Sequence, residues 1–96
     1  MRIYIIFFLI VLSFSCNENT KEENGREIFK INCISCHGID GKKGVIGAKD
    51  LSISDLEREE IKDVILNGRN NMLSFENLLK EEQIDSLVVF VESLRK

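Results

Sequence analysis

Two of the three cysteines and the only histidine lie close together, in the segment Cys33-Ile34-Ser35-Cys36-His37. Two cysteines three positions apart on a helix place both sulfur atoms on one side, and the next residue brings an imidazole beside them. The chain has 96 residues, a length that allows one domain. The function of this segment is therefore central to the function of that single domain.

The spacing C-x-x-C-H is typical of covalent haem attachment, in which the two thiols bond the haem vinyl groups and the histidine binds the iron. A zinc ribbon needs a second pair of ligands, and no cysteine or histidine follows His37. A thioredoxin-like redox pair needs a βαβ context, which this chain lacks. A disulfide between Cys33 and Cys36 closes too small a loop to stabilise the fold much. We therefore predict one covalently bound haem c.

Met72 is the candidate for the iron position that His37 leaves open. It is the only methionine besides Met1, and it lies in a loop between two predicted helices. Most methionines are soft core side chains, which is the alternative for Met72. Asn70, Asn71 or a lysine would be weaker or rarer iron ligands. The predicted pocket lining consists of Ile46, Leu51, Ile65, Phe75 and Leu87.

Hydrophobic periodicity predicts an all-α domain with three main helices. The first begins at residue 25, and one of its faces holds Gly25, Ile28, Phe29, Asn32, Cys33 and Cys36. A capping-box pattern at residues 54–57 opens the second helix, and Gly68 ends it. The apolar face of the second helix is Ile61, Val64 and Ile65. The third helix carries a stripe of Ile84, Leu87, Val88, Val91 and Leu94.

Residues 1–15 form a predicted signal peptide. A positive start at Arg2 precedes a ten-residue apolar run at residues 3–12 and a short stretch of small residues before Cys16. A transmembrane helix would need about 20 apolar residues. The sequence Leu-Ser-Phe-Ser-Cys resembles a bacterial lipoprotein signal, which implies a lipidated Cys16. Ordinary cleavage and an uncleaved anchor are the alternatives. Residues 16–24 then form the lipidated cysteine and a polar tether, and residues 25–96 form the domain.

From about Gly25 to Leu94 the chain resembles a small bacterial class I cytochrome c. Gly25 and Phe29 match the glycine and aromatic residue of the family's N-terminal helix, which pack against an aromatic residue of the C-terminal helix, here Phe90. Residues 33–38 match the attachment motif and its following glycine. Residues 47–51 resemble the loop whose backbone carbonyl accepts the second N–H of the histidine.

Residues 67–72 resemble the approach to the family's distal methionine. This resemblance implies that Cys33, Cys36, His37 and Met72 bind the cofactor, with His37 and Met72 as iron ligands. The family often has proline at the positions of Lys49 and Leu73, and missing prolines reduce loop rigidity. The implied fold is a cytochrome c fold, with three main helices and short helical turns around one haem.

The implied function is electron transfer rather than enzymatic catalysis. The expected protein is an exported monohaem cytochrome that passes single electrons between redox partner proteins. The alternative is a haem enzyme or small-ligand sensor whose distal Met72 is displaced. The formal net charge of −3 argues against a nucleic-acid partner. We expect a monomer on the periplasmic side of a bacterial membrane, held there by the lipid on Cys16.

Overall fold

The computed structural model describes residues 18–95, and its regular elements in that range are all helical. The helices are α2 (Glu18–Asn32), α3 (Ile34–His37), α4 (Arg58–Asn67) and α5 (Glu81–Ser93), with single 3₁₀ turns η1 (Val45–Gly47) and η2 (Leu51–Ile53). The predicted all-α class with three main helices is confirmed. The predicted signal peptide at residues 1–15 and the predicted lipidation site Cys16 lie outside the described residues.

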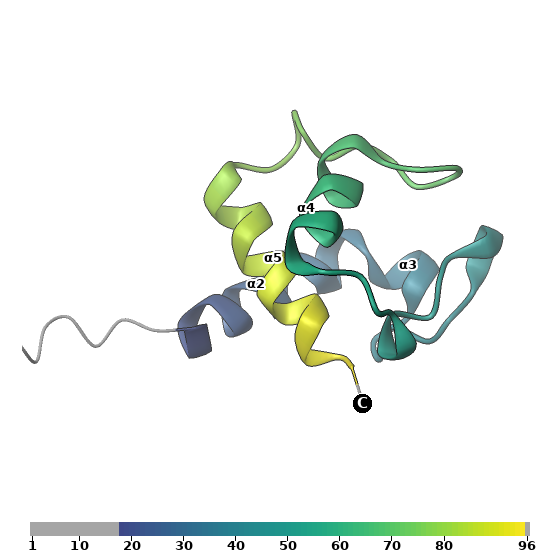
Figure 1. Ribbon diagram of the computed structural model, residues 1–96, viewed down its shortest axis with the longest axis horizontal. Helices are drawn as coiled ribbons and strands as arrows, with labels where there is room; N and C mark the ends of the chain where they lie inside the picture. Colours follow the sequence, from purple (N-terminus) through teal and green to yellow (C-terminus); the bar gives the residue numbers. More distant parts are fainter. Residues whose placement is uncertain (1–17, 96) are drawn as a thin grey trace, which may run out of the picture.

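The longest helix, α2, crosses α5, and this pair forms the base of the domain (Figure 1). The crossing is close because Gly25 has no side chain: a Cβ atom there would overlap the carbonyl oxygen of Ser86 and lie 2.8 Å from the Cβ of Phe90. The rings of Phe29 and Phe90 pack with their centroids 5.0 Å apart. The predicted contact of Gly25 and Phe29 with Phe90 is confirmed.

The predicted start of the first helix is wrong. The helix α2 begins at Glu18, so most of the residues that we predicted to form a tether are helical. Their side chains are largely exposed. Glutamate and lysine have high helix propensity, so this part of the helix forms although it has no apolar face. The helix also stops at Asn32, because Cys33 adopts φ −118° and separates α2 from the one-turn helix α3.

The capping box of α4 lies three residues later than predicted. The Glu57 side chain accepts from the backbone at Glu60, and the Glu60 carboxylate accepts from the Glu57 N–H at 3.2 Å. The Ser54 hydroxyl accepts instead from the Leu56 N–H at 3.4 Å. Ser54 therefore stabilises the turn before the helix. The predicted stop at Gly68 is confirmed, with φ 72°.

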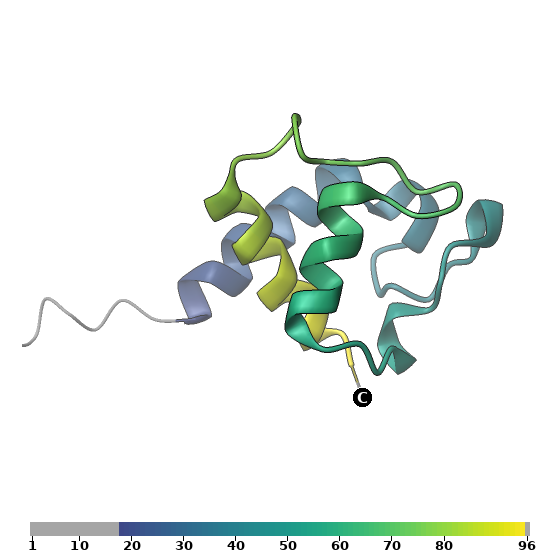
Figure 2. The same ribbon diagram turned by 45° about the horizontal axis from the view of Figure 1, so that its top comes forward.

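The helix α4 lies beside α5, and two long connections complete the domain. The first connection lies on the side away from the α2 N-terminus, and the second returns from that side to the start of α5 (Figure 2). Ion pairs tie α4 to α5: Lys62 lies 2.9 Å from Asp85, and Arg58 lies 2.7 Å from Glu92. The first connection, residues 38–57, contains η1 and η2, and the second is residues 68–80. Within residues 18–95, no helix is both long and apolar enough to span a membrane.

Candidate haem site

A cavity of about 500 Å³ is lined by the end of α2, the α3 segment, the two connections and the facing sides of α4 and α5. That volume lies in the ordinary range for small-molecule and cofactor sites. Cys33, Cys36, His37 and Met72 all line it, so the structure brings the four predicted site residues to one cavity. They come from two separate parts of the chain, the segment around α3 and the loop that follows α4.

The α3 segment sets the positions of the two thiols. Cys33 is buried and Cys36 is half-buried, and both are free thiols. Burial, and to a lesser extent Cys36, raises the pKa of the Cys33 thiol from 9.0 to about 11. Reactive thiols of redox pairs have lowered pKa values, so the environment of Cys33 is unlike theirs. In the described part of the chain, moreover, there is no cluster of three or more His, Cys, Asp or Glu side chains that could bind a metal ion by themselves.

The imidazole of His37 is oriented by a backbone carbonyl. Its Nδ1 lies 3.0 Å from the carbonyl oxygen of Lys49. Because a carbonyl only accepts, Nδ1 carries the hydrogen, and the lone pair of Nε2 is available for a metal. Lys49 belongs to the loop in which we expected this acceptor. After His37, the chain turns away at Gly38, which has φ 78°.

Met72 lies at the end of a tight turn. Its N–H donates to the Arg69 carbonyl at 2.9 Å, and Asn70 in between has φ 55°. The segment that follows is anchored to α4, because the Phe75 N–H donates to the Ile65 carbonyl at 3.0 Å. Met72 is half-buried and packs against the core. The turn and its anchors therefore hold Met72 in the lining of the cavity.

The cavity lining is mainly apolar. All five residues that we predicted for the lining contribute to it. The prediction missed further apolar lining residues, which are Phe29, Val45, Ala48, Ile53, Leu56, Ile61, Val64, Leu73 and Val91. The helical periodicity of Ile61 and Val64 with Ile65 was a signal that could have found two of them.

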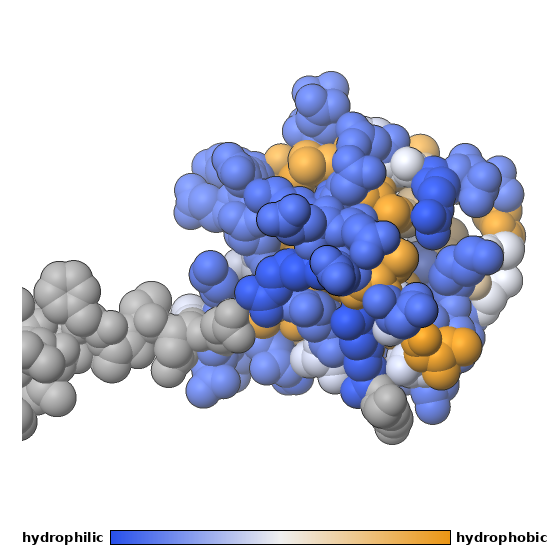
Figure 3. Space-filling model, in the orientation of Figure 1, coloured by the Kyte–Doolittle hydropathy of each residue, from blue (hydrophilic) through white to orange (hydrophobic). Residues whose placement is uncertain are grey.

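Several lining residues are apolar yet exposed. Ile46 is 67% exposed, Ile53 is 78% exposed and Leu73 is 69% exposed. Apolar side chains also reach the surface on the side of the molecule that carries the loops (Figure 3). A large apolar group in the cavity would cover such side chains, and two thiols, one imidazole and one thioether would surround it. The residues present therefore fit a haem c.

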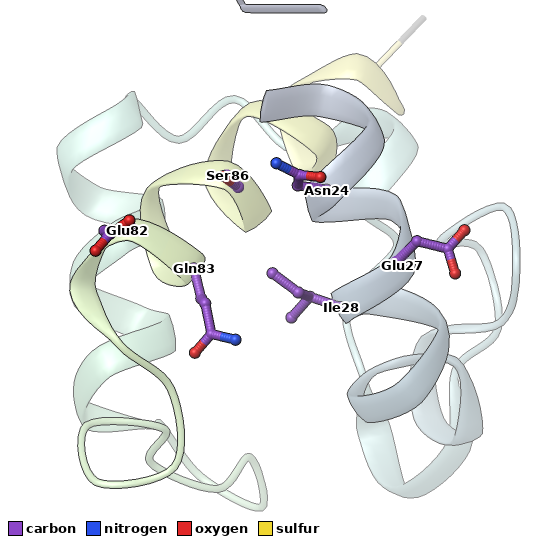
Figure 4. A pocket seen from close by; sticks show the side chains of 6 residues that line it. All are labelled: Asn24, Glu27, Ile28, Glu82, Gln83 and Ser86. Atoms are coloured by element: carbon purple, nitrogen blue, oxygen red, sulfur yellow. The ribbon is translucent and has the colours of Figure 1, made fainter. Parts of the chain in front are cut away.

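A second hollow, of about 310 Å³, lies between α2 and α5. Figure 4 shows Ile28 pointing from α2 toward α5, whereas Glu27 and Glu82 point away from each other. The remaining lining residues are Asn24, Gln83 and Ser86. None of these side chains carries sulfur or imidazole, so this hollow is separate from the candidate site.

The comparisons with known proteins agree with this geometry. Residues 20–91 match the model of the family described as "Cytochrome C oxidase, cbb3-type, subunit III". The chain therefore belongs to this family and is a small class I c-type cytochrome. A protein of this class contains one covalently bound haem c.

Individual relatives are cytochromes of similar size. The chain is 40% identical to a cytochrome c6 of Nostoc sp. over 74 residues, which are 71% of this chain and 66% of that protein. It is 36% identical to a cytochrome c6 of Anabaena variabilis over 71% of this chain and 85% of that protein. It is 34% identical to cytochrome c-555 of Methylococcus capsulatus over 83% of this chain and 68% of that protein. No solved structure matches the chain significantly.

Proposed function

We propose that this protein transfers single electrons between redox partner proteins as an exported monohaem c-type cytochrome. The observation that carries the proposal is that the thiols of Cys33 and Cys36, an oriented imidazole and a methionine thioether line the same cavity. The relatives support it, because they are named cytochrome c6 and cytochrome c-555. The described residues around the cavity otherwise contribute mainly apolar surface.

Each site residue has a separate role in this proposal. Cys33 and Cys36 would hold the haem through two thioether bonds, one from each sulfur. His37 supplies Nε2 to the iron, and the Lys49 carbonyl fixes the orientation of its ring. Met72 would supply its thioether sulfur as the second iron ligand.

The bound haem supplies an iron that changes between Fe(II) and Fe(III) by one electron. The protein sets the energy of that change. Histidine and methionine together favour the reduced state and raise the potential. The apolar lining, with Ile65, Phe75 and Leu87 buried around it, excludes water and disfavours the additional positive charge of Fe(III).

Carbon monoxide binding separates this function from the alternative of a haem enzyme or sensor. If Met72 occupies the sixth position, the reduced wild-type protein should bind carbon monoxide slowly or not at all near neutral pH. Met72→Ala should bind it readily and have a lower potential. Leu78→Ala is the matched control, because Leu78 lies in the same connection but outside the cavity. Rapid binding by the wild type would favour the enzyme or sensor.

We further propose that the protein is held on the periplasmic side of a bacterial membrane by lipid on Cys16, as a monomer. The support is the apolar run and the small residues before Cys16. The wild type should partition with membranes, and Cys16→Ala should be released or remain an unprocessed precursor. Mass spectrometry that finds a different N-terminus without acyl chains would exclude the lipid anchor.

A further inference from the structure

One side-chain hydrogen bond joins the two connections that form the cavity walls. The Nδ2 of Asn71 donates to the carbonyl oxygen of Ile46 at 3.3 Å, across 25 positions of sequence. Both residues line the cavity. Asn71 directly precedes Met72, and Ile46 precedes Lys49, whose carbonyl accepts from His37. The bond therefore links the wall that carries the methionine to the wall that orients the histidine.

The backbone is unusual at the Ile46 end of this bond and at Asn70, the residue before Asn71. Ile46 and Asn70 are the two non-glycine residues within residues 18–95 that have positive φ, 55° in each case. Asparagine tolerates the left-handed region, but a β-branched isoleucine there is an outlier. The isoleucine with this unfavourable conformation is the one whose carbonyl accepts from Asn71. Backbone outliers that persist in this way gather at functional sites.

The loop that presents Met72 has few other restraints on the cavity side. The chain contains no proline, so no ring fixes a φ angle next to Met72. On its N-terminal side, the Met72 N–H bonds only within its own turn, to Arg69. The anchors to α4 come later, at Ser74 and Phe75. The contact of Asn71 with Ile46 is thus the hydrogen bond that ties this turn to the opposite wall.

We propose that Asn71 is a positioning residue that keeps the Met72 turn closed over the cavity. By bonding Ile46 it disfavours the open state of the turn, and so it slows replacement of the Met72 sulfur by other ligands. This inference rests on the proposed function, because it takes Met72 as an iron ligand. A hydrogen bond of ordinary net strength changes such an opening equilibrium by about 2- to 10-fold.

The decisive variant is Asn71→Asp, which keeps the shape of the side chain but removes the N–H donor. The matched control is Asn77→Asp, which makes the same change of charge in the same connection but outside the cavity lining. The measurements are the rate of carbon monoxide binding to the reduced haem protein and the pH at which the ferric spectrum loses its methionine-ligated form. Hydrogen exchange at residues 69–73 is a third measurement, and it does not depend on an added ligand.

We expect Asn71→Asp to bind carbon monoxide about 2- to 10-fold faster than the wild type. It should also lose methionine ligation at a lower pH, and the amide hydrogens of residues 69–73 should exchange faster. Asn77→Asp should leave all three unchanged. If the wild type binds slowly, Met72→Ala binds fast and Asn71→Asp matches the wild type, the role of Asn71 is wrong while the ligation by Met72 stands. If the wild type already binds as fast as Met72→Ala, both are wrong.

Discussion

The α2–α5 helix pair and the cavity walls formed by the two connections differ in how their apolar side chains are buried. In the helix pair, apolar side chains of the chain itself fill the contact, and Ile84 and Val88 are only 1% and 2% exposed. In the walls, at residues 38–57 and 68–74, several apolar side chains remain exposed and two non-glycine residues adopt positive φ. The helix pair is complete with its own residues, whereas the walls are built around a group that the chain must acquire.

This difference explains how so short a chain forms a domain. Chains of this size bury a marginal core, and many small exported domains add a covalent or bound group. Here the helices provide a closely packed base through Gly25, Phe29 and Phe90. The segment around α3 brings two thiols and one imidazole to a cavity that Met72, in the second connection, also lines. The α2–α5 pair stabilises the fold, and the cavity provides the residues that bind the cofactor.

The largest expected change in the free energy of unfolding is in Gly25→Ala, which alters the contact between α2 and α5. Alanine favours a helix by about 1 kcal/mol over glycine. At this position, however, the new Cβ overlaps the Ser86 carbonyl, so the helices must separate. We expect a net loss of about 2–3 kcal/mol in the free energy of unfolding, measured by denaturant titration.

Gly44→Ala is the matched control in the walls. Gly44 has φ −109°, and the nearest atom to a Cβ there is the Ala48 carbonyl oxygen at 3.5 Å. The free energy of unfolding should change by less than about 0.5 kcal/mol. Equal losses in the two variants would remove the contrast between the regions.

Removal of the cofactor should affect the walls more than the helix pair. In the haem-containing protein, amide hydrogens of α5 should exchange most slowly. In a variant with both Cys33→Ser and Cys36→Ser, protection should fall further at residues 38–57 and 68–74 than in α5, because the exposed lining loses its cover. The measurement is hydrogen exchange followed by mass spectrometry. A uniform loss along the chain would contradict the comparison.

A smaller effect is expected at Asp50, which stabilises one wall. Hydrogen bonds from Ser52, opposed by partial desolvation and assisted by Lys42, hold the pKa of the Asp50 carboxyl below its usual 3.8. A lowered pKa in the folded state gives stability above the unfolded value, and this stability is lost as pH falls through the folded value. Asp50→Asn should therefore reduce stability near neutral pH and flatten its decline below about pH 4. The measurement is denaturant titration at a series of pH values, and an unchanged pH dependence in Asp50→Asn would contradict this role of Asp50.

The sequence was most informative where one local pattern decides the structure. The apolar stripe of α5 and the stop at Gly68 were predicted correctly, because periodicity and a glycine C-cap act over one or two helical turns. Cys33, Cys36 and His37 line the same cavity as Met72, as expected if all four residues bind one cofactor.

Predictions failed where two local signals compete or where distant contacts decide. Ser54 and Glu57 both resemble helix caps, and only the folded chain shows that Glu57 is used. The start of α2 was missed because polar residues give no periodic pattern. The positive φ of Ile46 runs against its own propensity, and its bond with Asn71 joins positions 25 residues apart.

The most direct test of the account is the covalent attachment of haem to the α3 segment. The wild-type protein, made in a host with the c-type maturation machinery, should retain haem stain through denaturing electrophoresis. Mass spectrometry should find the haem on the peptide that contains Cys33 and Cys36, and Cys36→Ala should greatly reduce the stain. A colourless zinc-containing product, or haem that is lost on denaturation, would contradict the assignment of this site.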